Sequence, residues 1–325
     1  MTPWSSSSPS SWAGRRDCRR QRGGEPPVDE LVGVPQRRGA RFVGGEGACA
    51  PPRPAGWKGK LWALHQGLTA IPPDTEYILF TDADIVYEPG ALARLVSEAE
   101  AKSLVLNSLM VKLRCESFAE RMLIPAFIFF FQMLYPFAWA NRPAAATAAA
   151  AGGCMLARRD ALHAAGGIEG IRGALIDDCA LAASLKRQVP IRLSLTDRVR
   201  SIRGYPDFQD IRRMVSRSAY AQLRYSPVLL AGMVIGMALT YLAPVAFTLF
   251  GHGIAQVLGL VTWVLMAIAF QPTLRFYRLS PLWGLALPAI ALVYLAFTLD
   301  SAYQHALGRG GMWKGRAQAN LSGSN

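Results

Sequence analysis

The sequence has 325 residues, of which 51% are hydrophobic and 18% charged, and its formal net charge is +13. This composition argues against a wholly water-soluble protein and indicates that part of the chain lies in lipid. The positive charge does not indicate a nucleic-acid partner, because the basic residues are scattered, without aromatic interleaving, and concentrate in the N-terminal segment and beside apolar spans.

Residues 1–55 show neither helical nor strand periodicity and are rich in serine, proline and arginine. This composition is typical of disordered segments. The segment contains no apolar stretch long enough for a signal peptide or an anchor. We therefore expect the folded part of the chain to begin near Gly56.

A glycine-flanked basic turn, Gly56–Lys60, leads into a short helix with leucines on one face. Lys58 and Lys60 lie at the helix start, where ammonium groups and free backbone N–H groups together bind phosphate oxygens. The glycine spacing is not that of a Walker loop. We expect these two lysines to contact phosphate.

The stretch Tyr77–Val86 is an apolar, strand-forming run that carries two carboxylates, Asp82 and Asp84. Side chains two positions apart on an extended backbone point the same way, so both acids could bind one hard cation, Mg²⁺ or Mn²⁺. Such a cation at the end of a strand would bind a diphosphate. The alternative is that the acids are solvated, or cap a helix that begins near Pro89.

An aromatic stretch, Met122–Trp139, follows a predicted helix around Leu92–Ala99 and a strand over 104–113. Two prolines and a glutamine interrupt it, whereas a membrane-spanning helix needs about 20 continuous apolar residues. We expect this stretch to lie in the plane of the lipid headgroups. A buried core helix is the alternative.

Two glycines, Gly152 and Gly153, precede a short strand and would let the backbone approach a ligand closely. A helix with Asp160 as its N-cap and a glycine stop is predicted next. Asp177 and Asp178 then stand side by side at a helix start. Capping explains one acid, so the second calls for another role.

A basic amphipathic helix is predicted over Asp210–Tyr225, ending in Gln222-Leu-Arg224-Tyr225. Three apolar spans of near-bilayer length follow. Basic residues before the first span and between the second and third place both loops in the cytoplasm. Three crossings would leave a basic tail outside, so either one span does not cross or the tail is an exception. The spans are roughly Val228–Phe250, Ile254–Phe270 and Leu282–Leu299.

The order of these features resembles the membrane-bound family 2 glycosyltransferases of GT-A fold. Residues 56–316 look most like the hopene-associated (hopanoid biosynthesis) glycosyltransferases, which share the motifs quoted at the end of this paragraph. The resemblance implies an α/β, Rossmann-like GT-A domain over 56–225, transmembrane helices over 226–303 and a polar tail over 304–325. It also implies a multi-pass protein of the bacterial inner membrane whose catalytic part faces the cytoplasm. The motifs are Gly-Trp-Lys-Gly-Lys-Leu-Trp-Ala, Thr-Asp-Ala-Asp-Ile, Leu-Ile-Pro-Ala-Phe, Gln-Leu-Arg-Tyr-Ser-Pro and Leu-Ser-Pro-Leu-Trp.

The resemblance further implies an inverting transfer of sugar from a nucleotide-diphosphate sugar to a lipid hydroxyl. Asp82 and Asp84 would hold the divalent cation, and Lys60 would add positive charge at the phosphates. Asp178 would be the general base, with Asp177 in the preceding acidic position.

Three further sites carry over from the family. Gly152 and Gly153 would admit the acceptor. Gln222 and Arg224 match the family's Gln-x-x-Arg-Trp signature loosely, with one residue fewer and tyrosine in place of tryptophan.

Residues 1–55 resemble none of the family's N-terminal strand motifs. We therefore expect a catalytic domain truncated at its N-terminus, preceded by a disordered segment or a misread gene start. The alternative function is that of a catalytically dead remnant acting as a membrane-associated partner of lipid-synthesis enzymes.

Overall fold

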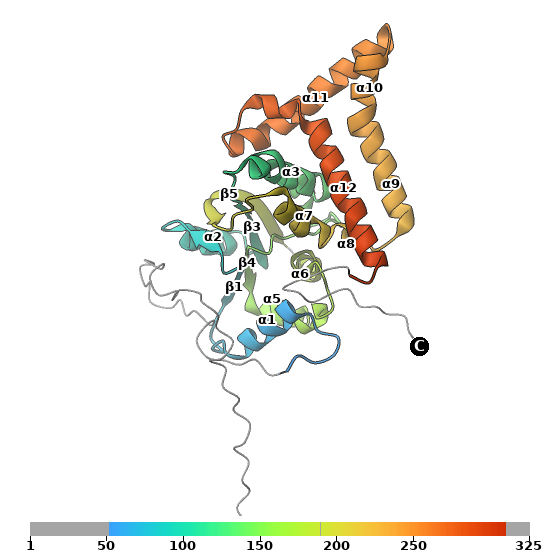
Figure 1. Cartoon of the computed structure of the whole chain (residues 1–325). Coiled ribbons are helices and arrows are strands. Elements are labelled where there is room, and N and C mark those ends of the chain that lie inside the picture. The colour runs from blue at the N-terminus through green and yellow to red at the C-terminus, as the bar shows by residue number, and fades with distance from the viewer. Residues whose placement is uncertain (1–51, 189, 310–325) are drawn as a thin grey trace, which may run out of the picture. The chain divides into compact units, whose positions relative to one another are not determined.

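The computed structural model describes residues 52–188 and 190–309. The chain divides into two units, Met1–Arg53 and Pro54–Asn325, and the elements shown in Figure 1 belong to the second. The predictions for residues 1–51 and for most of the polar tail lie outside the described residues.

A five-stranded mixed sheet forms the centre of the described part, in the order β1-β4-β3-β5-β2. β4 is antiparallel to both β1 and β3, β3 and β5 are parallel, and β2 is antiparallel to β5. The α/β class is therefore confirmed as a mixed sheet, and the GT-A assignment stays a prediction. The strands are β1 (Tyr77–Thr81), β2 (Ile85–Tyr87), β3 (Leu106–Lys112), β4 (Cys154–Arg158) and β5 (Ile191–Ser201).

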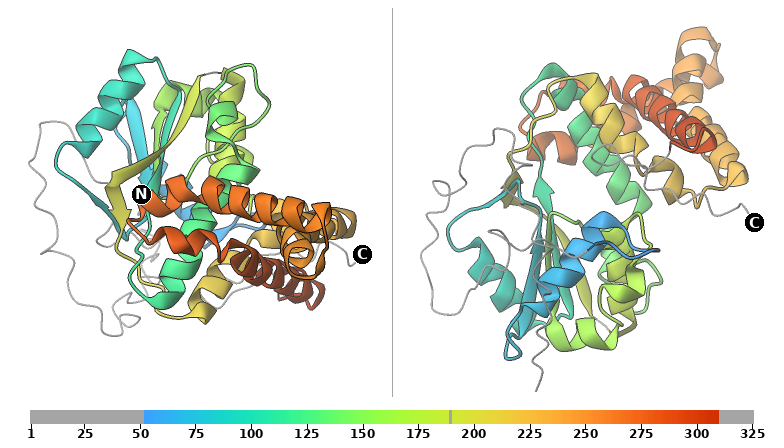
Figure 2. Two further views of the ribbon diagram at one scale, coloured as in Figure 1. Left: turned by 90° about the horizontal axis from the view of Figure 1, so that it is seen from above. Right: turned by 60° about the horizontal axis from the view of Figure 1, so that its bottom comes forward.

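Helices cover both faces of this sheet (Figure 2). α2 (Ala91–Ala101) buries Leu95 and Ala99 against one face. On the other face, α1 (Gly59–Thr69), α5 (Arg159–Ala164) and α6 (Asp177–Leu185) pack with the short helix η3 (Glu169–Ile171) beside them. The prediction of Asp160 as the N-cap is wrong, because α5 begins two residues earlier; its N-cap is Arg158, and Asp160 lies in its first turn.

The predicted in-plane stretch forms α3 (Phe118–Leu134) and α4 (Phe137–Ala140). Leu123, Ile124 and Ile128 are fully buried, so the core-helix alternative describes the first half of α3. Met133 and Leu134, at its end, are 53% and 52% exposed. The headgroup-plane prediction is therefore wrong for the buried half, because α3 packs against α7, α11 and α12.

The predicted amphipathic helix over Asp210–Tyr225 is in fact two helices, α7 (Phe208–Ser216) and α8 (Ala219–Gln222). The break falls at Arg217–Ser218, where α12 crosses both helices and the Ser301 hydroxyl accepts a hydrogen bond from the Tyr220 backbone N–H at 3.0 Å. Tertiary contacts have overridden the local helical pattern.

Two helices among the described residues are long and apolar enough to cross a membrane. The first, Pro227–Phe250, is built from α9 (Pro227–Met237), the π-helical turn η5 (Ala238–Leu242) and α10 (Ala243–Phe250). The second is α11 (Ile254–Phe276). Their mean hydropathies are 2.1 and 1.9, and only 11% and 17% of their most apolar stretches are buried, unlike a soluble core helix.

The third predicted span, Leu282–Leu299, is not among them. It forms the 3-10 turn η6 (Pro281–Gly284) and most of α12 (Leu287–Ala306), which lies along α7 and α8 (Figure 1). Arg212 donates two hydrogen bonds to Asp300, at 3.0 and 2.7 Å. α12 therefore packs one face against α3, α7 and α8, which a helix surrounded by lipid would not do.

A buried carboxylate, Glu120, ties the start of α3 to the loop that follows β5. It accepts backbone N–H bonds from Glu116, Ser117 and Tyr205 at 2.7, 2.9 and 2.6 Å. Burial alone would raise the pKa of Glu120, but these three donors outweigh it and lower the pKa. The carboxylate thus stabilises the fold above the pKa of an unfolded glutamate, and that contribution is lost as the pH falls through the lowered value.

Glu120→Ala is expected to lower the free energy of unfolding by about 2 kcal/mol or more, because it leaves buried N–H donors unpaired. Thermal unfolding of the purified protein in detergent measures this loss. Glu116→Ala is the matched control, because the Glu116 side chain is 68% exposed and pairs with Arg114 at the surface. Equal melting temperatures for the two variants would contradict a structural role for Glu120.

Candidate active site

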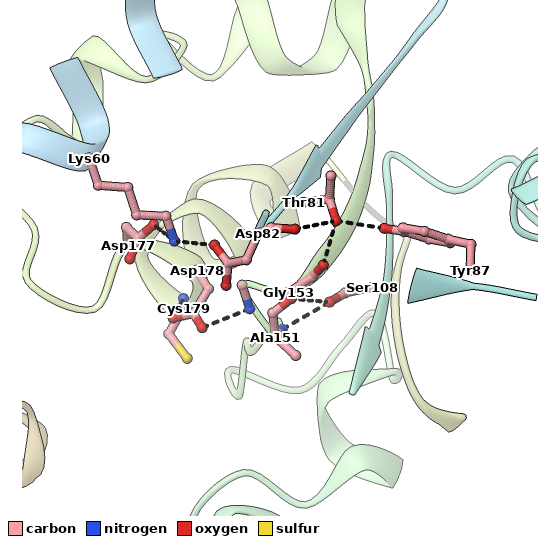
Figure 3. A network of polar contacts seen from close by, with 11 residues as sticks. Lys60, Thr81, Asp82, Tyr87, Ser108, Ala151, Gly153, Asp177, Asp178 and Cys179 are labelled. Atoms are coloured by element: carbon pink, nitrogen blue, oxygen red, sulfur yellow. Dashed lines mark hydrogen bonds and ion pairs between the residues drawn. The ribbon is translucent and has the colours of Figure 1, made fainter. Parts of the chain in front are cut away.

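The two acids of the Asp-x-Asp motif lie in the turn between β1 and β2. The prediction that the strand ends at the acids is confirmed, because β1 ends at Thr81. The extended backbone expected through both acids is wrong, because the chain turns before Ile85. The Thr81 hydroxyl lies 3.0 Å from the carbonyl oxygen of Gly153 and accepts a hydrogen bond from the Tyr87 hydroxyl at 2.9 Å (Figure 3). These contacts fix the turn to the glycine pair before β4.

Lys60 joins this turn to α6. Its ammonium nitrogen lies 2.9 Å from Asp177 Oδ2 and 3.6 Å from Asp82 Oδ1 (Figure 3). Burial would lower the pKa of Lys60, but the charges of Asp177 and Asp82 outweigh burial and raise it. Burial raises the pKa of Asp82, and the positive charge of Lys60 opposes that rise. The structure thus brings together three residues predicted from separate motifs.

Asp178 lies beside this ion pair, in the first turn of α6, where the predicted helix start is confirmed. Its two carboxylate oxygens accept backbone N–H bonds from Cys179 at 2.7 Å and from Gly152 at 3.0 Å. Burial, followed by the negative charge of Asp177, raises the pKa of Asp178 to about 6. A carboxylate with this pKa can accept a proton efficiently near neutral pH.

The two glycines before β4, Gly152 and Gly153, face different neighbours. A Cβ at Gly152 would lie 3.4 Å from Asp178 Oδ2 and 3.5 Å from Lys60 Nζ, whereas a Cβ at Gly153 would lie 3.2 Å from a methyl of Val111. The buried Ser108 hydroxyl holds the turn, accepting from the Ala151 N–H at 2.9 Å (Figure 3). Gly152 therefore faces the acids, and Gly153 faces the core.

Gly152→Ala is expected to fold normally and to lower kcat about 10-fold. The added methyl makes only ordinary contacts, but it fills the space between the Asp178 carboxylate and the Lys60 ammonium group, and a misplacement of about 1 Å is enough to slow chemistry strongly. Circular dichroism and turnover of the purified variant measure the two effects. Gly153→Ala is the control, for which a stability loss is expected instead; unchanged kcat in Gly152→Ala would contradict the assignment.

The other predicted contact residues are Lys58, Gln222 and Arg224. Lys58 precedes α1, is 8% exposed, and its backbone N–H donates to the Arg172 carbonyl at 2.9 Å. Gln222 accepts a hydrogen bond from the Tyr135 hydroxyl at 2.6 Å. Arg224 is exposed, has a φ of 52°, and forms no ion pair within the described part of the chain.

Two residues near the acids had no signal in the sequence. The Ser201 hydroxyl, at the end of β5, donates to Asp84 Oδ2 at 2.8 Å. Burial raises the pKa of Tyr135, and Cys179 and Asp178 add to the rise, which places the phenol close to α6. Neither residue belongs to a motif, so only the tertiary structure reveals them.

Asp82 and Asp84 are the predicted ligands of a divalent cation. Among residues 52–188 and 190–309, no group of three or more His, Cys, Asp or Glu side chains is arranged to hold a metal ion. Two carboxylates are nevertheless suitable partial ligands for Mg²⁺ or Mn²⁺, which bind phosphate oxygens and water at their other positions. A cation at this turn would have to share its coordination with a diphosphate, and the predicted cation site stays a prediction.

Residues 48–318 match the sequence profile of glycosyl transferase family 21. The chain belongs to this glycosyltransferase family. No curated protein matches the chain. The family 21 match confirms the predicted enzyme class, whereas the family 2 assignment and the hopanoid association stay predictions.

Membership of family 21 gives the acidic cluster a chemical context. A glycosyltransferase uses a nucleotide-sugar donor and an acceptor, so the cluster of Lys60, Asp82, Asp177 and Asp178 is the candidate place for both to meet. The two long apolar helices add a weak indication of membrane association.

Proposed function

We propose that this family 21 enzyme transfers a sugar, with inversion, from a nucleotide-diphosphate sugar to a lipid hydroxyl at the cytoplasmic face of a membrane. The apolar helices Pro227–Phe250 and Ile254–Phe276, which leave most of their surface exposed, support a lipid acceptor. The sequence motifs favour a hopanoid-type lipid. A GT-A fold accords with an acidic turn that follows a strand of a mixed sheet.

In the proposed reaction, Asp178 accepts the proton of the acceptor hydroxyl while the oxygen of that hydroxyl bonds to the anomeric carbon of the donor sugar. The bond from that carbon to the diphosphate breaks on the opposite face, which inverts the configuration. A divalent cation bound by Asp82 and Asp84 would supply charge neutralisation for the leaving diphosphate. Lys60 adds positive charge from the side of Asp82.

The observation that carries the proposal is the environment of Asp178. Its carboxylate has a pKa of about 6 and is oriented by two backbone N–H groups, and the Asp177 next to it is ion-paired to the lysine that also approaches Asp82. The proposed base and the proposed diphosphate contacts thus belong to one connected cluster of side chains.

The test is transfer of labelled sugar by the full chain in lipid nanodiscs, with a panel of nucleotide sugars and extracted bacterial lipids. We expect label in the organic phase, and a product whose anomeric configuration, measured by NMR, is opposite to that of the donor. A product that retains the anomeric configuration of the donor would contradict the inverting mechanism. Label found only in water-soluble products would contradict the assignment of a lipid acceptor. The absence of any product would favour the alternative of a catalytically inactive remnant.

Lys60→Met is expected to move the acidic limb of the kcat/KM profile to higher pH. The positive charge of Lys60 favours the ionised carboxylate, so its removal raises the pKa of Asp178 above about 6. Activity measured from pH 5 to 9 gives the shift. Lys102→Met is the matched control, since Lys102 pairs with Glu98 on α2, and a profile shifted equally in both variants would contradict this prediction.

A further inference from the structure

The bend that follows β5 contacts the Asp84 side of the acidic turn. The Ser201 hydroxyl donates to Asp84 Oδ2 at 2.8 Å and accepts the backbone N–H of Arg203 at 3.2 Å. One hydroxyl group therefore connects the backbone of Arg203 to the Asp84 carboxylate. Lys60 approaches the same turn from the side of Asp82.

The aromatic ring of Tyr205 supports the Arg203 side chain. The guanidinium carbon lies 5.5 Å from the ring centroid, within the range of a cation–π contact. Tyr205 itself is 8% exposed and is fixed by its backbone N–H, which donates to Glu120 at 2.6 Å, and by its carbonyl, which accepts from the Ser117 hydroxyl at 3.3 Å. The guanidinium therefore rests on a rigid platform.

Arg203 is exposed, and within residues 52–188 and 190–309 it forms no ion pair. Burial raises the pKa of the Tyr205 phenol; the positive charges of Arg203 and Arg217 oppose that rise, whereas Asp84 and Asp82 add to it. Both arginines and both acids are thus close enough to the same phenol to act on it. Arg203 and Arg217 therefore place positive charge near Asp82 and Asp84. Within the described residues, no ion pair joins these arginines to the two acids.

A guanidinium group binds phosphate through two parallel N–H bonds, and stacking on an aromatic ring leaves those edges free. We propose that Arg203 binds the diphosphate of the nucleotide-sugar donor on the Asp84 side of the acidic turn, opposite the approach of Lys60. This inference rests on the proposed function, because it takes the donor to bind at Asp82 and Asp84. An anionic lipid headgroup offers the same phosphate chemistry, so the experiment separates the two sources.

The experiment measures inorganic pyrophosphate binding with Mg²⁺, and donor KM, for the full chain in phosphatidylcholine nanodiscs. Arg203→Gln is expected to weaken pyrophosphate binding and raise donor KM about 10- to 100-fold, the effect of losing a charged hydrogen bond. Arg203→Lys should recover part of the loss. Arg200→Gln removes the same charge from an exposed arginine on β5, opposite Val86, and should behave as wild type.

Each other outcome has a defined meaning. If wild type transfers sugar and Arg203→Gln keeps its donor KM and pyrophosphate affinity, the inference is wrong and the proposed function stands. If pyrophosphate binding depends on Arg203 but no donor is turned over, the proposed function is wrong and the diphosphate site stands. A loss seen only in nanodiscs with anionic phosphatidylglycerol would assign Arg203 to lipid and overturn the inference. Should Arg203→Gln fail to fold, a wild-type affinity in Arg203→Lys would overturn it too.

Discussion

Asp178→Asn is expected to lower kcat by about 10²- to 10⁴-fold, the contribution typical of a positioned general base. The amide has nearly the shape of the carboxylate, and its oxygen can still accept one of the two N–H bonds from Gly152 and Cys179. It cannot take the proton of the acceptor. Single-turnover transfer of labelled sugar by the purified variant measures the loss, and wild-type rates would contradict the assignment.

The pH profile tests the same residue independently. Asp178 must be ionised to act, so wild-type kcat/KM should fall below about pH 6, its raised pKa, while the residual activity of Asp178→Asn should not. A raised carboxyl pKa also means that the contribution of Asp178 to stability is complete below the unfolded pKa and is lost as the pH rises through about 6. Asn has no charge to bury, so the melting temperature of the variant at pH 7 should not fall.

Replacing Asp82 and Asp84 together by alanine is expected to lower transfer about 10²- to 10³-fold or more, because the leaving diphosphate loses its electrostatic stabilisation. The variant should also lose its response to added Mg²⁺ or Mn²⁺. Activity against metal concentration, together with Mn²⁺ binding measured by electron paramagnetic resonance, gives both readouts.

Asp197→Ala is the control for this double variant, since Asp197 is an exposed acid on β5. It should keep both activity and metal response. A double variant that still glycosylates lipid at the wild-type rate would remove the acidic turn from the mechanism.

Local patterns in the sequence predicted which elements carry several candidate site residues, and for physical reasons. A strand-forming run before Asp82, a glycine pair before β4 and acids at the start of α6 each depend on neighbours in the sequence, so each motif could be placed on its element. How the motifs meet could not be predicted. The 2.9 Å contact of Lys60 with Asp177 and the bond of Ser201 to Asp84 join residues more than a hundred positions apart.

Hydrophobic periodicity predicted the helices less well where tertiary contacts decide the outcome. An apolar stretch has the same sequence pattern whether lipid or protein surrounds it. The stretch Leu282–Leu299, predicted as a membrane span, forms a 3-10 turn and most of a helix that packs against α7 and α8. The break at Arg217–Ser218 has the same origin. α12 buries Leu287, Ile290 and Tyr294, whereas the two long apolar helices leave most of their apolar stretches exposed.

The packing of α12 against the sheet-containing part of the protein determines which truncated forms of the protein can fold. Tyr294 and Phe297 share a core with Ile124 and Ile211, and the Tyr294 hydroxyl donates to the Leu123 carbonyl at 2.7 Å. A soluble fragment that ends before α9 would lack α12, and the core residues that α12 buries would be exposed to water. Expression of the isolated catalytic half should therefore give aggregates. A folded enzyme should require the chain through α12 with α11 in place, because α11 also packs against α3 and buries Phe270 and Leu274 in the same core.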